Sequence, residues 1–291
     1  MRHFLNVVFF CSACLIWGPV PAQTIPAQTI QAQTIQAQTI QAEVAKQVLR
    51  ALGLSDVIAV MRQEGLAQGD EMSGARLPSG AASDWQRSLE MIYNVDRMGK
   101  TVTRRFFKEL GDVDMAPVLA FLTSPTGQRL VALELSAREA MMEGDIEQAA
   151  RAAFRALDGK SDARLTVLND FVRANDLVEA NVTGALNANY AYYRGLHKSG
   201  ALGMSDQQML EQVWSGEAEA RTDINEWVFA FLLMAYRPLG EDVVAEYAAL
   251  SQTEAGKRMN RALFAGFDEM FRDISFALGM ATGRILQTQE L

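Results

Sequence analysis

Carboxylates are the most abundant side chains in this chain that could act as catalytic acids or bases. Two segments hold them at helical spacing: Glu134, Glu139 and Glu143 in one, and Asp268, Glu269 and Asp273 in the other. A glycosidase needs two carboxyl groups across a cleft, one with a raised pKa, and nothing in the spacing selects such a pair. Asp268 and Arg272, four residues apart, are typical of an ion pair on a helix surface. We therefore interpret these carboxylates as solvated, and a carboxylate-based hydrolase is the weakest functional hypothesis.

Other catalytic side chains are scarce. His3, Cys11 and Cys14 lie within the first 22 residues, and His197 is the one histidine beyond them. A chain that loses this segment has no disulfide and no cysteine-rich or histidine-rich metal site. The sequence contains no dinucleotide fingerprint, phosphate-binding loop, nucleophile elbow or zinc-protease motif. We predict no enzymatic activity, no cofactor and no metal, and we interpret His197 as a cation near a helix C-terminus.

Two segments share a residue pattern typical of a helix start. They read Ser124-Pro125-Thr126-Gly127-Gln128-Arg129-Leu130 and Thr253-Glu254-Ala255-Gly256-Lys257-Arg258-Met259, so the second begins 129 positions after the first. An N-cap Ser or Thr hydroxyl accepts a hydrogen bond from a backbone N–H of the first turn, where Pro and Glu are also favoured. A glycine inside a helix costs about 1 kcal/mol relative to alanine. We therefore expect another segment to pack closely against Gly127 and Gly256.

The same pattern has an alternative, functional interpretation. A helix N-terminus with a nearby arginine, here Arg129 or Arg258, can bind an anion. Anion-binding turns usually expose several consecutive amides by means of more glycine than is present here. We favour a capped and tightly packed helix, in which the arginine donates a charge-assisted hydrogen bond to the preceding segment.

The shared helix start belongs to a longer internal similarity. The offset of 129 aligns residues 83–155 with 212–284 without a gap, and its matched pairs include Trp85/Trp214 and the joints Leu110-Gly111/Leu239-Gly240. Such a register indicates a tandem duplication. We predict two related repeats, over residues 43–158 and 159–287.

The pattern from Glu43 onward is helical. Ala, Leu, Met, Glu, Gln and Arg dominate, and alternating β-branched runs are absent. We expect helices over residues 84–110, 115–122, 125–142, 146–157, 165–173, 177–193, 205–236 and 254–286, a short helix beginning at Pro238, and loops over 69–83 and 199–203. The predicted fold class is all-α, with two related multi-helix repeats that form one elongated or compact helical body.

The N-terminus predicts export. Residues 1–22 have the basic start, apolar stretch and small residues before the cleavage point of a signal peptide. Residues 23–42 then continue a five-residue repeat of Ala-Gln-Thr-Ile and a variable residue, which we predict to be a disordered low-complexity linker. We expect a periplasmic or secreted protein with no membrane span after signal removal. Losing Arg2 changes the net charge from −8 to −9, which disfavours nucleic-acid binding.

The segment from Val118 to Leu130 resembles the signature of a bacterial envelope family, catalogued as domain of unknown function 2059. Members carry a Phe-Tyr pair followed by Ser or Thr, Pro, Gly and a basic residue. The likeness covers roughly residues 85–150 and, more weakly, 214–284. This chain has Leu122 where the family usually has Tyr, and Glu254 replaces Pro in the second half. The resemblance implies an all-helical exported protein and supplies no catalytic residues.

Two groups of side chains are candidates for contact with a ligand or partner. One is a basic stripe at helical spacing, formed by Arg97, Lys100, Arg104 and Lys108. It could meet anionic lipid, glycan or an acidic protein, or it could simply be solvated. The other is the aromatic set Tyr193, Trp214 and Trp227, which suits sugar stacking or core packing.

These patterns favour a non-enzymatic binding or scaffolding module of the cell envelope. Its expected partner is an envelope protein or a glycan. The alternative is a binder of a small molecule or glycan in a cleft between the repeats, for which we expect a pocket lined by Tyr193, Trp214 or Trp227.

Overall fold

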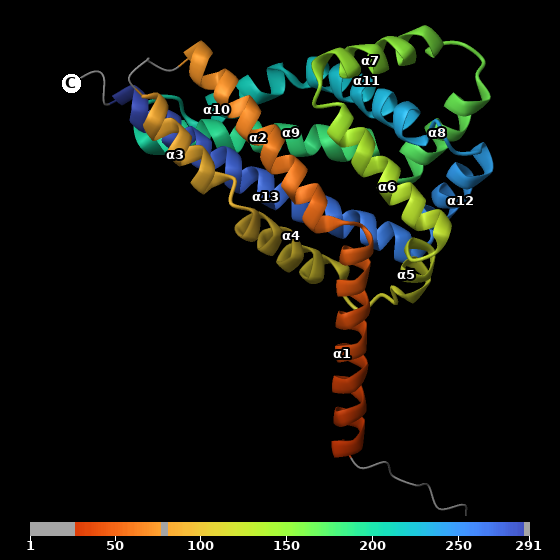
Figure 1. Ribbon diagram of the computed structural model, residues 1–291. Helices are drawn as coiled ribbons and strands as arrows, with labels where there is room; N and C mark the ends of the chain where they lie inside the picture. The colour runs from red at the N-terminus through yellow and green to blue at the C-terminus, as the bar shows by residue number, and fades with distance from the viewer. Residues whose placement is uncertain (1–26, 77–80, 288–291) are drawn as a thin grey trace, which may run out of the picture. The chain divides into compact units, whose positions relative to one another are not determined.

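The computed structural model describes residues 27–76 and 81–287. The predicted signal peptide lies outside these residues. The helices are α1 (Ala27–Ala51), α2 (Leu54–Arg76), α3 (Ala82–Ile92), α4 (Val95–Leu110), α5 (Ala116–Leu122), α6 (Pro125–Ala140), α7 (Gly144–Leu157), α8 (Ala163–Ala174), α9 (Leu177–Ser199), α10 (Asp206–Ser215), α11 (Glu217–Tyr236), α12 (Glu241–Gln252) and α13 (Glu254–Gln287) (Figure 1). The described residues contain no strand, so the predicted all-α class is confirmed.

The N-terminal repeat segment differs from expectation. We predicted an irregular linker over residues 23–42, whereas α1 begins at Ala27 and continues through the described part of that segment. Alanine and glutamine have high helix propensity, so a five-residue period that builds no apolar stripe still permits helix. The chain divides after Ala37 into two units, and all contacts described below lie in the second, residues 38–291.

Two expected long helices are interrupted by local capping residues. The predicted helix over 84–110 breaks at Tyr93 and Asn94, because the Asn94 side chain accepts a hydrogen bond from Arg97 N at 3.0 Å and caps α4. The predicted helix over 205–236 breaks at Gly216, between α10 and α11. Glycine is a weak helix former, and helix breaks therefore collect at such positions.

Two other boundaries differ as well. The expected loop over residues 69–83 is largely helical, because α2 continues to Arg76. The Trp85 indole N–H donates to the Gly69 carbonyl at 2.8 Å and fixes α3 against this end of α2. The short helix expected at Pro238 begins at Glu241 instead, with Gly240 as its N-cap.

The C-terminal helix α13 packs along both α9 and α4 (Figure 1). It has 34 residues, and small side chains allow the close approach to α9. A Cβ on Gly279 would lie 2.2 Å from the Tyr192 carbonyl oxygen, and a Cβ on Gly195 would lie 2.3 Å from that of Phe276. Real Cβ atoms do not approach oxygen this closely, so both positions require glycine.

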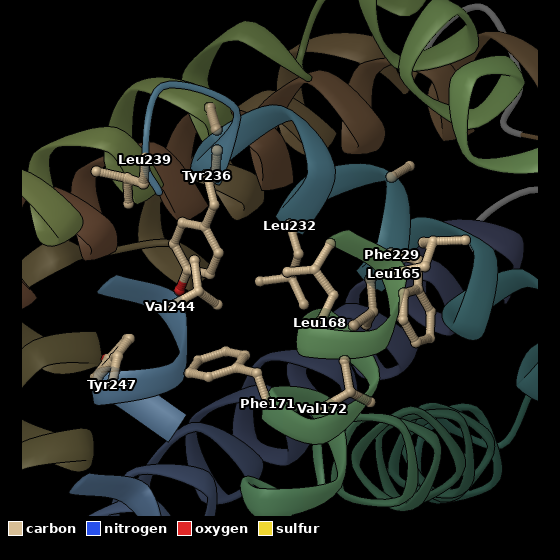
Figure 2. Packing of buried hydrophobic residues seen from close by; sticks show 14 of the residues in the cluster. Leu165, Leu168, Phe171, Val172, Phe229, Leu232, Tyr236, Leu239, Val244 and Tyr247 are labelled. Carbon is tan, nitrogen blue, oxygen red and sulfur yellow. The ribbon is translucent and has the colours of Figure 1, made fainter. Parts of the chain in front are cut away.

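Apolar side chains gather in three clusters within residues 38–287. One joins α8, α11 and α12, where the aromatic rings of Phe171, Tyr236 and Tyr247 meet (Figure 2). A second joins α5 to the end of α1 and the start of α13. A third, around Trp85, joins α2, α3 and α4 to the later part of α13. The last helix thus contributes to two of the three clusters.

The residue pairs of the predicted duplication occupy partly similar environments. Leu110 and Leu239 are both buried. Trp85 and Trp214 are not equivalent, because Trp85 is 0% exposed and Trp214 is 63% exposed. The two halves also differ after α6. Helix α6 ends there, whereas α13 continues without a break past the aligned positions of the second half. Some aligned pairs therefore share a residue type but not a structural environment.

Candidate functional site

The two matching helix starts have the same geometry. The Ser124 hydroxyl accepts from Gly127 N at 3.1 Å, and the Thr253 hydroxyl accepts from Gly256 N at 3.0 Å. Each hydroxyl also donates to a carbonyl three residues earlier, at 2.6 and 2.7 Å. A Cβ on either glycine would lie 2.1 Å from a carbonyl oxygen of the preceding helix, that of Phe121 or Leu250. These positions hold capped helices packed against the helix before them.

The arginines of the two helix starts differ in their partners. Arg129 donates to the Pro238 carbonyl at 3.2 Å, which links α6 to the turn before α12. Arg258 Nε is buried and has no hydrogen-bond partner among the described residues. Pro125 occupies the first turn of α6, where its missing N–H removes no helical hydrogen bond.

The basic stripe on α4 is partly engaged with its own fold. The Arg97 guanidinium donates to the carbonyls of Met91 and Ile92, both at 2.7 Å, and ties α4 to the end of α3. Arg104 donates to Glu269 of α13 at 2.6 Å. Lys100 and Lys108 are exposed. The stripe is therefore not a row of four unpaired cations.

The three aromatic candidates do not converge on one site. Trp214 is exposed on α10. Tyr193 of α9 makes an edge contact with Tyr192, with ring centroids 6.3 Å apart. Trp227 of α11 lines a cavity, and its ring stacks on Phe231 at 5.3 Å between centroids. Of the three, only Trp227 belongs to the cavity described next.

A cavity of about 870 Å³ lies among α2, α6, α9, α11 and α13, and the end of α1 contributes to its edge. Small residues of α9, including Gly184, Ala185 and Ala188, form one wall and leave the space open. A Cβ on Gly184 would meet no atom within 4 Å. Its size lies within the range of sites that hold small organic ligands.

Five aromatic side chains line this cavity. Phe264, Phe267 and Phe271 follow one another at helical spacing on α13, and Trp227 and Phe231 face the cavity from α11. All five are half-buried. Aromatic side chains usually pack inside a hydrophobic core. Here they line the cavity, so the cavity wall is predominantly apolar.

Glu134 of α6 is the carboxyl group set into this apolar wall. It accepts a hydrogen bond from the Tyr236 hydroxyl of α11. Burial raises the pKa of Glu134 to about 7, and the tyrosine hydrogen bond partly opposes that shift. Burial and the nearby Glu134 charge also raise the pKa values of Tyr236 and Tyr247 well above their ordinary range. Glu134 therefore changes its charge near neutral pH while both tyrosines stay neutral.

Arg138 and Asp268, two other charged groups of the lining, have partners. Arg138 makes two hydrogen bonds to Glu64 of α2, at 2.9 and 2.8 Å. Asp268 accepts from Asn187 Nδ2 at 2.8 Å and lies 3.2 Å from Arg272 Nε. These pairs join the helices around the cavity and leave Glu134 with a neutral hydrogen-bond donor.

The interpretation of the carboxylates as solvated is wrong for Glu134. Glu139 and Glu143 are exposed, as that interpretation required. Glu134, however, lies four residues after the buried Leu130 and three residues before the buried Ala137. It therefore shares their inward side of α6. That helical register was the available sequence signal, because a carboxylate at i+4 from a core leucine shares its face.

A second cavity, of about 550 Å³, lies where α8, α9 and α11 approach one another. Asp176 lines it with a backbone φ of 54°. Two of its charged groups pair with each other, since Arg221 binds Glu179, and Arg221 also lies 2.7 Å from Glu217, which does not line the cavity. The lining holds two cations, Arg173 and Arg221, and two carboxylates, Asp176 and Glu179, so its formal charges balance.

The described residues hold neither a cluster of metal ligands nor a helix suited to spanning a membrane. Within residues 27–76 and 81–287, there is no group of three or more His, Cys, Asp or Glu side chains that could hold a metal ion. In the same residues, no helix combines the length and the apolar character needed to cross a membrane.

Comparison with known proteins gives one match. No curated protein and no solved structure matches the chain. A second copy of the matching family in the later half is not shown. Residues 96–156, from the start of α4 to the end of α7 and including Glu134, match the bacterial family described as "Uncharacterized protein conserved in bacteria (DUF2059)".

Proposed function

We propose that this protein is a non-enzymatic helical module that binds an apolar or amphiphilic small molecule in the cavity among α2, α6, α9, α11 and α13. The cavity of about 870 Å³ with five aromatic side chains in its wall carries the proposal. Ligand sites of this kind are mostly apolar, with a few polar groups that fix orientation. Glu134 and its Tyr236 partner are such groups.

Two of the alternatives have less support. A glycan would require many hydrogen-bonding groups, whereas the wall is dominated by Phe, Trp, Val, Leu and Ala side chains. A carboxylate-based hydrolase would require a second carboxyl group acting with Glu134. The hydrogen bond of Glu134 is with a tyrosine hydroxyl. These observations favour binding without turnover.

The proposal includes export and an origin by tandem duplication. Residues 1–22 support export by their signal-like pattern. The matching cap and glycine contacts at the starts of α6 and α13 support duplication. Helices α2 and α9 also have equal lengths of 23 residues. In this arrangement the cavity lies between the repeats, because α2 and α6 belong to the first and α9, α11 and α13 to the second.

Filling the cavity is expected to abolish binding. We expect the neutral fluorescent dye N-phenyl-1-naphthylamine to bind the wild-type protein with increased emission. Gly184→Phe places a ring in open space within the cavity and should weaken binding by about tenfold or more. Asn189→Phe is the matched control, since Asn189 is exposed on the same helix and does not line the cavity.

Circular dichroism shows whether both variants keep the wild-type helix content. Absence of dye binding to the wild-type protein would contradict the proposal. Equal binding by Gly184→Phe and Asn189→Phe would do so as well, because the dye would then sit elsewhere.

A further inference from the structure

The cations of the cavity wall are paired more completely than its carboxylates, so the wall favours a positively charged ligand. Among the residues that line it, Arg50 and Arg138 are cations. Arg138 is held by Glu64 through two hydrogen bonds, and Arg50 lies 2.9 Å from Glu43. Neither glutamate lines the cavity. Both cations are therefore neutralised by carboxylates outside the wall.

The carboxylates of the wall are less completely neutralised. Asp268 has Arg272 and Asn187 as partners, and Asp56 is exposed at the edge of the cavity. Glu134 has the Tyr236 hydroxyl as its hydrogen-bond donor, and no ion pair of the described residues includes it. An ionised Glu134 thus lies in an apolar wall without a cationic partner. Glu134 is half-buried, and a partly desolvated charge in this situation is stabilised by an opposite charge.

The aromatic side chains favour the same sign. The cavity is lined by the aromatic rings of Trp227, Phe231, Phe264, Phe267 and Phe271. Cations are attracted to the faces of aromatic rings, most strongly when water is excluded. An anion would instead meet the aromatic faces and Glu134 with the unfavourable sign. The apolar surface of the same rings accommodates a large hydrocarbon body.

We infer that the ligand of this cavity is a lipophilic amine, whose ammonium group lies at Glu134 and whose apolar body contacts the aromatic walls. This inference rests on the proposed function, because it names the chemical class that the cavity takes. It assigns Glu134 as the group that selects the ligand by charge. Arg138, which lies on the same helix as Glu134, is held by Glu64 of α2 and stays out of that contact.

Binding of such an ammonium group depends on pH. A cation favours the ionised form of Glu134, so affinity should rise as pH passes through the raised pKa of Glu134, about 7. The titratable or charged groups of the surrounding helices are Arg50 of α1, Asp56 and Glu64 of α2, Arg138 of α6, Tyr236 of α11, Tyr247 of α12 and Asp268 of α13. Tyr236 and Tyr247 stay neutral near pH 7, because their pKa values are raised.

Three naphthalene probes of similar size separate charge from apolar fit. They are (1-naphthylmethyl)trimethylammonium, 1-naphthylacetamide and 1-naphthylacetate. Each is titrated into the full protein by calorimetry and also used to displace N-phenyl-1-naphthylamine. The ammonium probe is expected to bind about tenfold more tightly than the amide at pH 8, and the anion more weakly than either. The advantage of the ammonium probe should shrink at pH 5.5.

Two variants test the role of Glu134. Glu134→Gln should remove the ammonium preference and its pH dependence while dye binding persists. Glu139→Gln, an exposed glutamate of the same helix, should retain both. Dye binding without any charge preference would overturn the inference and leave the proposed function standing. Retention of the preference in Glu134→Gln would also overturn it. Failure of the dye and all three probes to bind would reject the proposed function itself.

Discussion

Replacement of Gly127 or Gly256 by alanine is expected to lower the free energy of unfolding by about 3 kcal/mol, because the new methyl group meets backbone. In each case the Cβ would lie 2.1 Å from a carbonyl oxygen six positions earlier, and under 3 Å from two further backbone atoms. A flexible side chain could move aside, but these atoms belong to the end of the preceding helix. Helices α6 and α13 would have to shift away from α5 and α12.

The matched control is Gly99→Ala in α4, where a Cβ would meet nothing within 4 Å. There the higher helix propensity of alanine should leave stability unchanged or raise it by up to about 1 kcal/mol. Urea unfolding followed by circular dichroism measures all three variants. If Gly127→Ala and Gly256→Ala unfold at the wild-type midpoint, the close contact with the preceding helix is not rigid and its structural role is refuted.

The second large effect is a loss of stability with rising pH that Glu134 causes. Its folded-state pKa of about 7 lies above the ordinary value of 4.5. The folded protein therefore holds this proton more tightly than the unfolded chain does. The resulting stabilisation is complete below pH 4.5 and is lost as pH rises through 7. The shift corresponds to about 3 kcal/mol, since one pKa unit is about 1.4 kcal/mol.

Glu134→Gln keeps the shape of a neutral carboxyl group and removes its titration. The free energy of unfolding of this variant should match that of the wild type below pH 4.5 and exceed it by up to about 3 kcal/mol near pH 8. Glu139→Gln should follow the wild-type profile at each pH, because Glu139 is exposed. Parallel profiles for wild type and Glu134→Gln would mean that Glu134 is not held in an apolar environment.

Helix positions could be predicted well where the sequence carries its own start signal. The Ser124-Pro125 and Thr253-Glu254 pairs begin α6 and α13 at the expected residues. The breaks at Asn94 and Gly216 were missed, because both lie within continuous helical patterns where a local cap overrides periodicity. The helical state of the repeat segment in α1 does not follow from periodicity, because this segment has no apolar stripe, and the helix propensity of its alanine and glutamine residues is the signal that indicates it.

The cavity could not be predicted from spacing, because five helices from distant parts of the sequence surround it. Trp227 was a candidate as an aromatic residue, but nothing in its neighbourhood separated it from the exposed Trp214. The phenylalanines of α13 follow the helical spacing of an ordinary core stripe. Only the small residues of α9 opposite them leave the space unfilled. A cavity is a mismatch between facing surfaces, and sequence patterns within single helices do not record it.

The place of α13 after the helices that it covers has a consequence for the order of assembly. The inward faces of α4 and α9 are covered by a helix that begins at Glu254. Until ribosomal synthesis passes that residue, apolar side chains such as Met98 and Val102 have no α13 surface to cover them. The native fold therefore closes only once α13 has been synthesised. A polypeptide interrupted before α13 would expose apolar helix faces that chaperones and proteases recognise.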